Sequence, residues 1–130
     1  MAKSTPKSEA AAELPEVALS GVAKRCFVIM PFGQTTAVHT ESYWTEMYEL
    51  FLRPLIQEIP DLVAMRSQPG RTDVIGEIVK ELLTADIVVA DLTDANPSVY
   101  WELGVRQSFK YGTVTIAEYG TKLGFDLSTK

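Results

Sequence analysis

Short runs of apolar residues alternate with longer amphipathic stretches along most of the chain. Four of these runs are bounded by Pro, Gly or Asp, at residues 25–30, 62–65, 86–92 and 113–117. A continuous apolar run of this length is typical of a strand that is buried on both faces. The four runs therefore predict four strands, and the run at 86–92, DIVVADL, gives the strongest pattern.

The stretch between the first two runs predicts a long helix over residues 42–59. Its apolar side chains recur at helical spacing, at Trp44, Met47, Tyr48, Phe51, Leu55 and Ile59. Thr40 is placed to cap the N-terminus of this helix with its side-chain oxygen. Pro54 has no N–H to donate and its ring clashes with the carbonyl four residues earlier, so a kink or break is expected there.

Two shorter helices are expected over about residues 74–82 and 98–110. Asn96 and Pro97 form a start signal for the second of them, as the N-cap and first-turn residues. Gly112 follows its end, where glycine is favoured because it adopts the left-handed conformation without strain. The helices therefore lie between the strands along the chain.

The resulting order, β-α-β-α-β-α-β, is the pattern of an α/β fold. It implies a parallel sheet with helices on both faces and right-handed crossovers. We predict the strand order 2-1-3-4, and the residues expected near the carboxyl ends of the strands are Met30, Met65, Leu92 and Ala117. Ligands of such sheets bind at those ends, near the switch in strand order.

Length and composition limit the chain to one such domain. It has 130 residues, of which 46% are hydrophobic and 22% are charged, enough for about one core. Residues 1–23 carry no long apolar stretch and are expected to be a flexible tail or linker before a domain at 24–130. No secretory signal or membrane-spanning run is visible, so a cytoplasmic location without membrane contact is expected.

Charge, cysteine content and missing motifs exclude several function classes. The net charge of −5 argues against a nucleic-acid partner, because phosphate binding needs a basic surface. The single cysteine, Cys26, excludes an internal disulfide and a multi-cysteine zinc site, and it is expected to pack as a small apolar residue. The only histidine, His39, is expected to be a solvated loop residue, so no metal site is predicted. The phosphate-binding loop and the Gly-x-Gly-x-x-Gly dinucleotide motif are both absent.

Two acidic residues stand near the expected ligand-binding edge. Asp91 ends the strand at 86–92, and Glu102 lies on the next helix among apolar neighbours. Burial would raise the pKa of Glu102 and keep its carboxyl reactive. The alternative is structural: Glu102 and Arg106 would form a surface i,i+4 pair, Asp91 would cap the next turn and Asn96 would only cap the helix.

Three motifs, FVIMPFG, ADIVVADLT and NPSVYWELG, resemble those of one known superfamily. This is the nucleoside 2-deoxyribosyltransferase-like group, which includes nucleotide N-ribohydrolases and is related to TIR-type NAD-cleaving domains. The likeness extends over about residues 25–128 and implies a flavodoxin-like fold, in agreement with the predicted element order. Relatives continue into a further strand after a segment like GFDLSTK, so this chain is expected to be a fragment or a variant without that strand.

The resemblance also implies roles for individual residues. Glu102 matches the glutamate of the family's Glu-x-Gly helix motif, the catalytic carboxylate that attacks or stabilises the anomeric carbon while the base leaves. Asp91 would join it by holding the ribose or the base. Asn96 replaces an acid that is common in the deoxyribosyltransferases, which weakens the case for transfer more than for nucleotide binding. The other implied substrate contacts are Phe32 and Gly33, at the base and sugar, and Arg71, at a phosphate.

The expected function is cleavage or transfer at the N-glycosidic bond of a nucleoside, nucleotide or NAD. Such a reaction passes through a cationic sugar that a preorganised carboxylate stabilises, and it needs no metal or bound cofactor. The alternatives are a nucleotide-sensing domain without turnover and a TIR-type self-association module, the latter implying a homo-oligomer.

Overall fold

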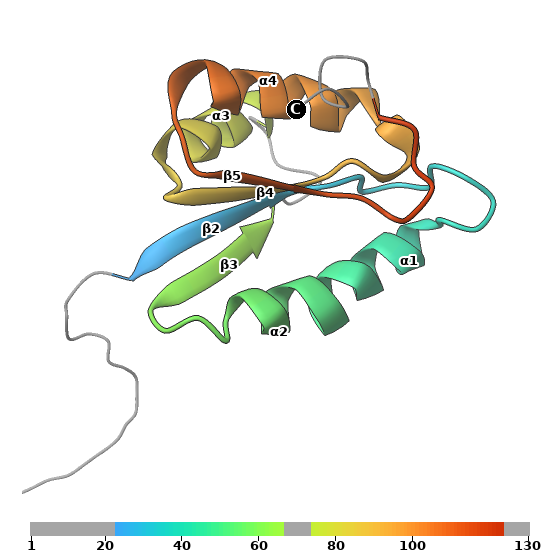
Figure 1. Cartoon of the computed structure of the whole chain (residues 1–130), viewed down its shortest axis with the longest axis horizontal. Helices are drawn as coiled ribbons and strands as arrows, with labels where there is room; N and C mark the ends of the chain where they lie inside the picture. The colour runs from blue at the N-terminus through green and yellow to red at the C-terminus, as the bar shows by residue number, and fades with distance from the viewer. Residues whose placement is uncertain (1–22, 67–73, 124–130) are drawn as a thin grey trace, which may run out of the picture.

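The computed structural model describes residues 23–66 and 74–123, which are built around one parallel four-stranded sheet (Figure 1). The strands are β2 (Lys24–Ile29), β3 (Leu62–Arg66), β4 (Ile87–Asp91) and β5 (Thr113–Ile116). Their order across the sheet is β3-β2-β4-β5, and all three neighbouring pairs are parallel. The prediction of a flavodoxin-like α/β fold with strand order 2-1-3-4 is therefore confirmed.

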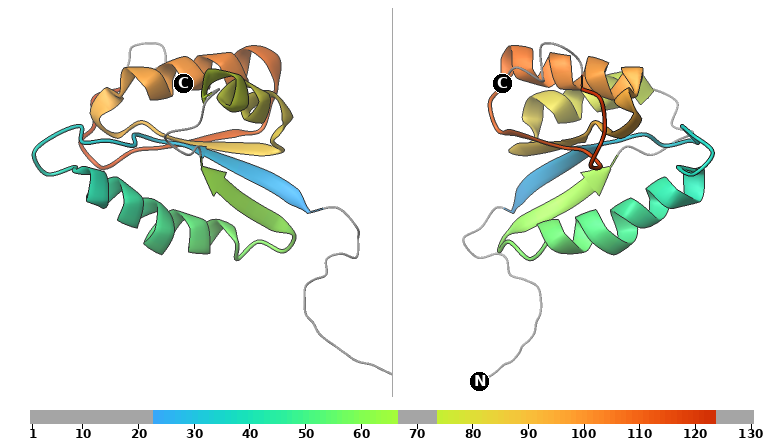
Figure 2. Two further views of the ribbon diagram at one scale, coloured as in Figure 1. Left: turned by 180° about the vertical axis from the view of Figure 1, so that it is seen from behind. Right: turned by 45° about the vertical axis from the view of Figure 1, so that its right-hand side comes forward.

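Helices cover both faces of the sheet (Figures 1 and 2). One face carries a nearly continuous helical stretch made of α1 (Glu41–Glu46), the π-helical η3 (Met47–Leu52) and α2 (Arg53–Ile56). The other face carries α3 (Val74–Thr84) and α4 (Pro97–Phe109), with the 3-10 turn η4 (Thr93–Ala95) just before α4. None of the described helices is long and apolar enough to cross a membrane.

Each face of the sheet has its own apolar core. Cys26 and Val28 of β2 pack in the core beneath α1, η3 and α2, whereas Phe27 and Ile29 pack in the core beneath α3 and α4. Burial on both faces explains why the run is continuously apolar instead of alternating. Cys26 is 1% exposed and burial raises the pKa of its thiol to about 11, as expected of a cysteine that packs as a small apolar residue.

The long helical stretch contains the expected disturbance at Pro54, as a widened turn and not as a break. η3 has π-helical bonding, and the N–H of Arg53 donates to the carbonyl of Tyr48, five residues earlier. The wider turn accommodates a proline that has no N–H to donate. Thr40 caps α1 as predicted, accepting a hydrogen bond of 3.2 Å from the N–H of Tyr43.

Arg106 of α4 is fully buried and connects α4 to the segments that precede β4 and β5. Its guanidinium group donates hydrogen bonds of 2.6–3.3 Å to the backbone carbonyls of Leu82, Ala85, Asp86, Tyr111 and Gly112. Buried carbonyls without a donor cost folding free energy, so the arginine is a structural residue. The alternative that Arg106 forms a surface pair with Glu102 is therefore wrong.

Gly112 is expected to tolerate no side chain. Its φ is +90°, and an added Cβ would lie 2.8 Å from the carbonyl oxygen of Asp86 and 3.1 Å from Nη2 of Arg106. Because of the strain and the close contact, Gly112→Ala is expected to lower the free energy of unfolding by about 2–3 kcal/mol. Urea titration measures the change.

The matched control is Gly104→Ala. Gly104 is exposed on α4, and nothing lies within 4 Å of the position its Cβ would take. There the methyl group is expected to stabilise the helix by about 0.5–1 kcal/mol. Equal effects of the two substitutions would contradict the account of Gly112.

Candidate functional site

Three loops meet at the carboxyl edge of the sheet, where α/β folds bind their ligands (Figure 1). They follow β2 (residues 30–40), β4 (92–96) and β5 (117–123). Side-chain contacts connect all three loops. This edge is the one that the strand pattern predicts for the site.

His39 lies between two carboxylates at this edge. Its Nδ1 is 2.7 Å from Oδ2 of Asp94, and its Nε2 is 3.0 Å from Oε1 of Glu118. The imidazole ring also packs against the rings of Tyr43 and Trp44, at centroid distances of 4.5 and 5.5 Å. One side chain thus joins the three loops to the start of α1.

Hydrogen bonds extend this contact into a network. Thr35 Oγ1 donates to Oδ2 of Asp94 at 2.7 Å and accepts from Nε1 of Trp44 at 3.2 Å. The backbone N–H of Glu118 donates to Oγ1 of Thr93 at 2.8 Å. The network holds the loops in a defined arrangement, as a preorganised site requires.

Asp94 is the most constrained residue of the network. Its φ is +67° and that of Ala95 is +51°, a left-handed conformation that costs non-glycine residues about 1–2 kcal/mol each. Burial raises the pKa of the Asp94 carboxyl, but hydrogen bonds from Thr35 and His39 outweigh it and hold the pKa below its usual value. Backbone strain beside an ionised, oriented carboxylate is typical of functional sites.

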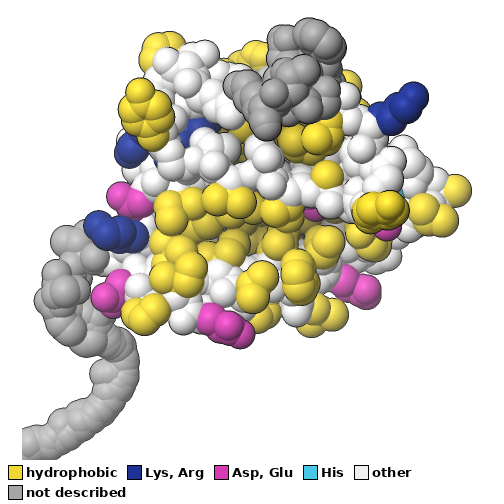
Figure 3. Space-filling view, in the orientation of Figure 1, with side chains coloured by type: hydrophobic (Ala, Val, Ile, Leu, Met, Phe, Trp, Pro, Cys, Tyr) yellow, Lys and Arg dark blue, Asp and Glu magenta, His cyan; other side chains and the backbone are white. Residues whose placement is uncertain are grey.

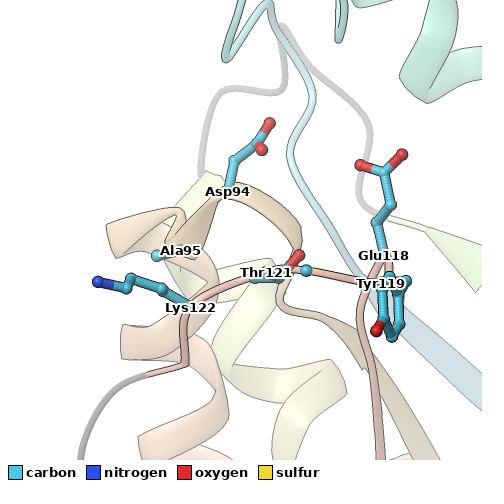
Figure 4. Close-up of a pocket in the computed structure, with 7 residues that line it drawn as sticks. Asp94, Ala95, Glu118, Tyr119, Thr121 and Lys122 are labelled. Carbon is cyan, nitrogen blue, oxygen red and sulfur yellow. The ribbon is translucent and has the colours of Figure 1, made fainter.

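A pocket of about 370 Å³ opens beside this network, lined by Asp94, Ala95, Glu118, Tyr119, Gly120, Thr121 and Lys122 (Figure 4). Figure 4 shows the carboxylates of Asp94 and Glu118 pointing to the same side, while Tyr119 and Lys122 point away from them. Two carboxylates and a threonine offer acceptors for the hydroxyl groups of a polar ligand. Within residues 23–66 and 74–123, no group of three or more His, Cys, Asp or Glu side chains is suited to hold a metal ion.

The sequence did not indicate this network. His39 is 7% exposed, so the expectation of a solvated loop residue is wrong. The rings that bury it belong to α1, and its acidic partners lie more than fifty residues further along the chain. A feature of the sequence that could have indicated the network is the position of Asp94, just after the most clearly predicted strand.

Phe32, Gly33 and Arg71 are the predicted base, sugar and phosphate contacts. The ring centroid of Phe32 lies 4.3 Å from the guanidinium carbon of Arg66, a buried residue whose Nη2 donates to the carbonyl of Pro31 at 3.0 Å. Gly33 is exposed, and a Cβ there would meet nothing within 4 Å. Arg71 lies outside the described residues.

Asp91 and Asn96 both bind backbone N–H groups. Asp91 is 1% exposed, and its Oδ1 accepts from the N–H of Thr93 at 3.0 Å. Oδ1 of Asn96 accepts from the N–H groups of Ser98 and Val99 at 3.0 and 3.2 Å and caps α4 as predicted. The turn-capping and helix-capping interpretations are confirmed, and a contact of either residue with substrate stays a prediction.

Glu102 is half-buried in the second turn of α4. Among the described residues none donates a hydrogen bond to its carboxyl or forms an ion pair with it. Arg106, the expected partner, is bound to backbone carbonyls instead. Burial raises the pKa of the Glu102 carboxyl to about 7. The partial burial and the raised pKa are those that the first interpretation of the sequence predicts for Glu102.

A common cleft is expected for Phe32, Asp91, Asn96 and Glu102. Phe32 follows β2, Asp91 ends β4 and Asn96 caps α4, so these three lie at the carboxyl edge. Within the described part of the chain, no hydrogen bond, ion pair or ring contact joins any two of the four. The shared cleft stays a prediction.

The raised pKa of Glu102 predicts a pH dependence of stability. A glutamate of the unfolded chain titrates near 4.5, whereas Glu102 in the folded state has a pKa of about 7. The folded state therefore binds the proton of the Glu102 carboxyl more tightly than the unfolded state does. The stability that this proton contributes is lost as the pH rises from about 4.5 to about 7. The loss is on the order of 2 kcal/mol.

Urea unfolding of the wild type and of Glu102→Gln, each at pH 5 and pH 8, isolates this contribution. Glutamine does not titrate. From pH 5 to pH 8, the free energy of unfolding of the variant should therefore rise relative to that of the wild type by on the order of 2 kcal/mol. A difference that is the same at both pH values would show that the carboxyl is solvated in the folded state.

The chain matches no protein-family model, and no curated protein matches it either. Function is accordingly inferred from the side chains and their geometry.

Proposed function

We propose that the protein cleaves or transfers at the N-glycosidic bond of a nucleoside, nucleotide or NAD, with Glu102 as the catalytic carboxylate. The observation that carries the proposal is a half-buried carboxyl with no partner among the described residues and a pKa near neutrality. Burying such a group costs folding free energy, so the presence of this carboxyl favours a role in function. The helix that bears it starts at the carboxyl edge of the sheet.

The chemistry requires a negative charge close to the sugar. As the bond from the anomeric carbon to the base breaks, the electron pair leaves with the base and the sugar becomes cationic. A carboxylate opposes that charge or bonds to the anomeric carbon, and water or an acceptor base then completes the reaction. With a pKa of about 7, roughly half of the Glu102 carboxyls are ionised at neutral pH, and the developing positive charge favours the ionised form.

Polar groups at the carboxyl edge, where the helix that bears Glu102 starts, support this assignment. Asp94 and Glu118 line a pocket whose acceptors suit sugar hydroxyl groups, and the His39 contacts fix the positions of both. Orienting hydrogen bonds of this kind lower the barrier because they hold the substrate in the reactive geometry.

Product analysis tests the proposal. The chain is incubated with NAD, nucleoside monophosphates and deoxynucleosides, and free base is detected by chromatography, with and without a second base as acceptor. Release of base supports the proposal, and exchange of bases distinguishes transfer from hydrolysis. Binding without turnover would overturn the proposal in favour of a nucleotide-sensing domain. The absence of both binding and turnover would contradict both functions.

A further inference from the structure

The outer edge of β5 has backbone groups with which no described strand pairs. β5 is the last strand of the sheet and has one neighbour among the described strands, β4. The N–H groups of Val88 and Leu92 donate to the carbonyls of Gly112 and Ile116. Because successive residues of a strand point their backbone groups to opposite sides, those of the two threonines of β5 point away from β4.

The sequence of this edge has none of the residues that usually prevent pairing. Natural edge strands are protected by lysine, proline, inward-pointing charges or bulges. Residues 112–117 read GTVTIA, with no charged residue and no proline, and the register with β4 is regular. β-Branched residues favour the extended conformation that a further strand would need.

An apolar surface lies next to this edge, on the face of the sheet that α1, η3 and α2 cover in part (Figure 3). Ile116 and Ile87 pack against that core, and Val114 is on the same face as Ile116, two residues away. Met47 packs there too, and Phe51 and Leu55 follow it at intervals of four along the helical stretch. Phe51, Leu55 and Val114 are 52%, 49% and 51% exposed. We name these six residues the β5-side face.

We propose that two copies of the chain form a symmetric dimer in which β5 pairs antiparallel with β5 of the second copy. A two-fold axis at Thr115 brings each outward-facing group opposite a partner. Thr115 then exchanges hydrogen bonds with its own counterpart, and Thr113 does so with Ala117 of the second copy. Val114 lies opposite the second copy's Ile116, so the two β5-side faces form one apolar surface.

A second copy fits this surface better than a charged partner does. Each chain carries a net charge of −5, yet β5 and the β5-side face are uncharged, so like charges do not meet at the seam. Phe51, Leu55 and Val114 are each about half exposed, so this face offers apolar surface to a partner. A standard interface buries about 800 Å² per partner, to which the backbone of β5 and the surrounding polar residues also contribute. A dimer of roughly micromolar affinity is expected.

Cysteine cross-linking tests the register. Counterparts at Thr115 would have Cα atoms about 5.5 Å apart, within disulfide range, whereas counterparts at Thr113 would be about 14 Å apart. Thr115→Cys is therefore expected to form a disulfide-linked dimer under mild oxidation at least tenfold faster than Thr113→Cys. The natural Cys26 is buried and does not compete. Equal rates for the two variants would overturn the proposal.

Analytical sedimentation of the chain without cross-links tests whether the β5-side face forms the dimer interface. The wild type should be dimeric at high micromolar concentration, and Val114→Lys should be monomeric, because it places a charge opposite the apolar partner. Val63→Lys is the matched control, since Val63 is a 44% exposed valine on the opposite edge strand, β3. A monomeric wild type, or a dimer that Val63→Lys breaks and Val114→Lys does not, would overturn the proposal. Circular dichroism confirms that each variant is folded.

Discussion

Replacing Arg106 with alanine is expected to destabilise the protein by about 3–5 kcal/mol. The fully buried guanidinium group donates to five backbone carbonyls, and alanine leaves these acceptors without it and opens a cavity beside α4. The free energy of unfolding of domains of this size is about 5–15 kcal/mol, so the melting temperature of the variant should be far below that of the wild type. Thermal and urea unfolding followed by circular dichroism measures the loss.

Arg53→Ala is the matched control for this substitution. Arg53 also lies on a helix, four residues after a glutamate, and forms an ion pair with that residue, Glu49. Both side chains are nearly half exposed, at 46% and 45%, and surface pairs of this kind contribute a few tenths of a kcal/mol. If Arg106→Ala cost no more than Arg53→Ala, the structural role of Arg106 would be refuted.

Glu102→Gln is expected to lower the rate of base release by about 10²–10³-fold, and by more if the carboxylate is also a nucleophile. Glutamine keeps the shape and one acceptor oxygen of the side chain but loses the negative charge that opposes the cationic sugar. Since that charge acts mainly in the transition state, nucleotide affinity should stay within about tenfold of the wild type. Calorimetric titration with a nucleotide measures the affinity, and chromatography of the free base measures the rate.

The strand pattern was sufficient to predict the fold. Buried parallel strands must be apolar on both faces, and the run at 86–92 therefore identifies β4 with little ambiguity. Asn96 is recognisable as a cap because Pro97 follows it directly, a local pattern that needs no tertiary information. Local rules of this kind also placed Asp91 at the carboxyl edge of the sheet.

Long-range contacts explain what the sequence could not predict. The spacing of Glu102 and Arg106 is that of a surface pair. The carbonyls of Leu82 and Ala85, 24 and 21 residues earlier in the chain, show that the arginine points inward. His39 stands in a polar stretch, and its burial depends on Asp94 and Glu118 in two later loops. Helical spacing and loop polarity carry no information about such partners.

The rate of base release by Glu102→Gln, measured beside that of Glu58→Gln, decides whether Glu102 is the catalytic carboxylate. Glu58 is an exposed glutamate in the turn after α2, so the same chemical change there should leave the rate as in the wild type. Glu102→Gln is expected to lose at least about 10²-fold in rate while remaining folded and, at pH 8, more stable than the wild type. Base release by Glu102→Gln at the rate of the wild type and of Glu58→Gln would show that Glu102 is a structural residue.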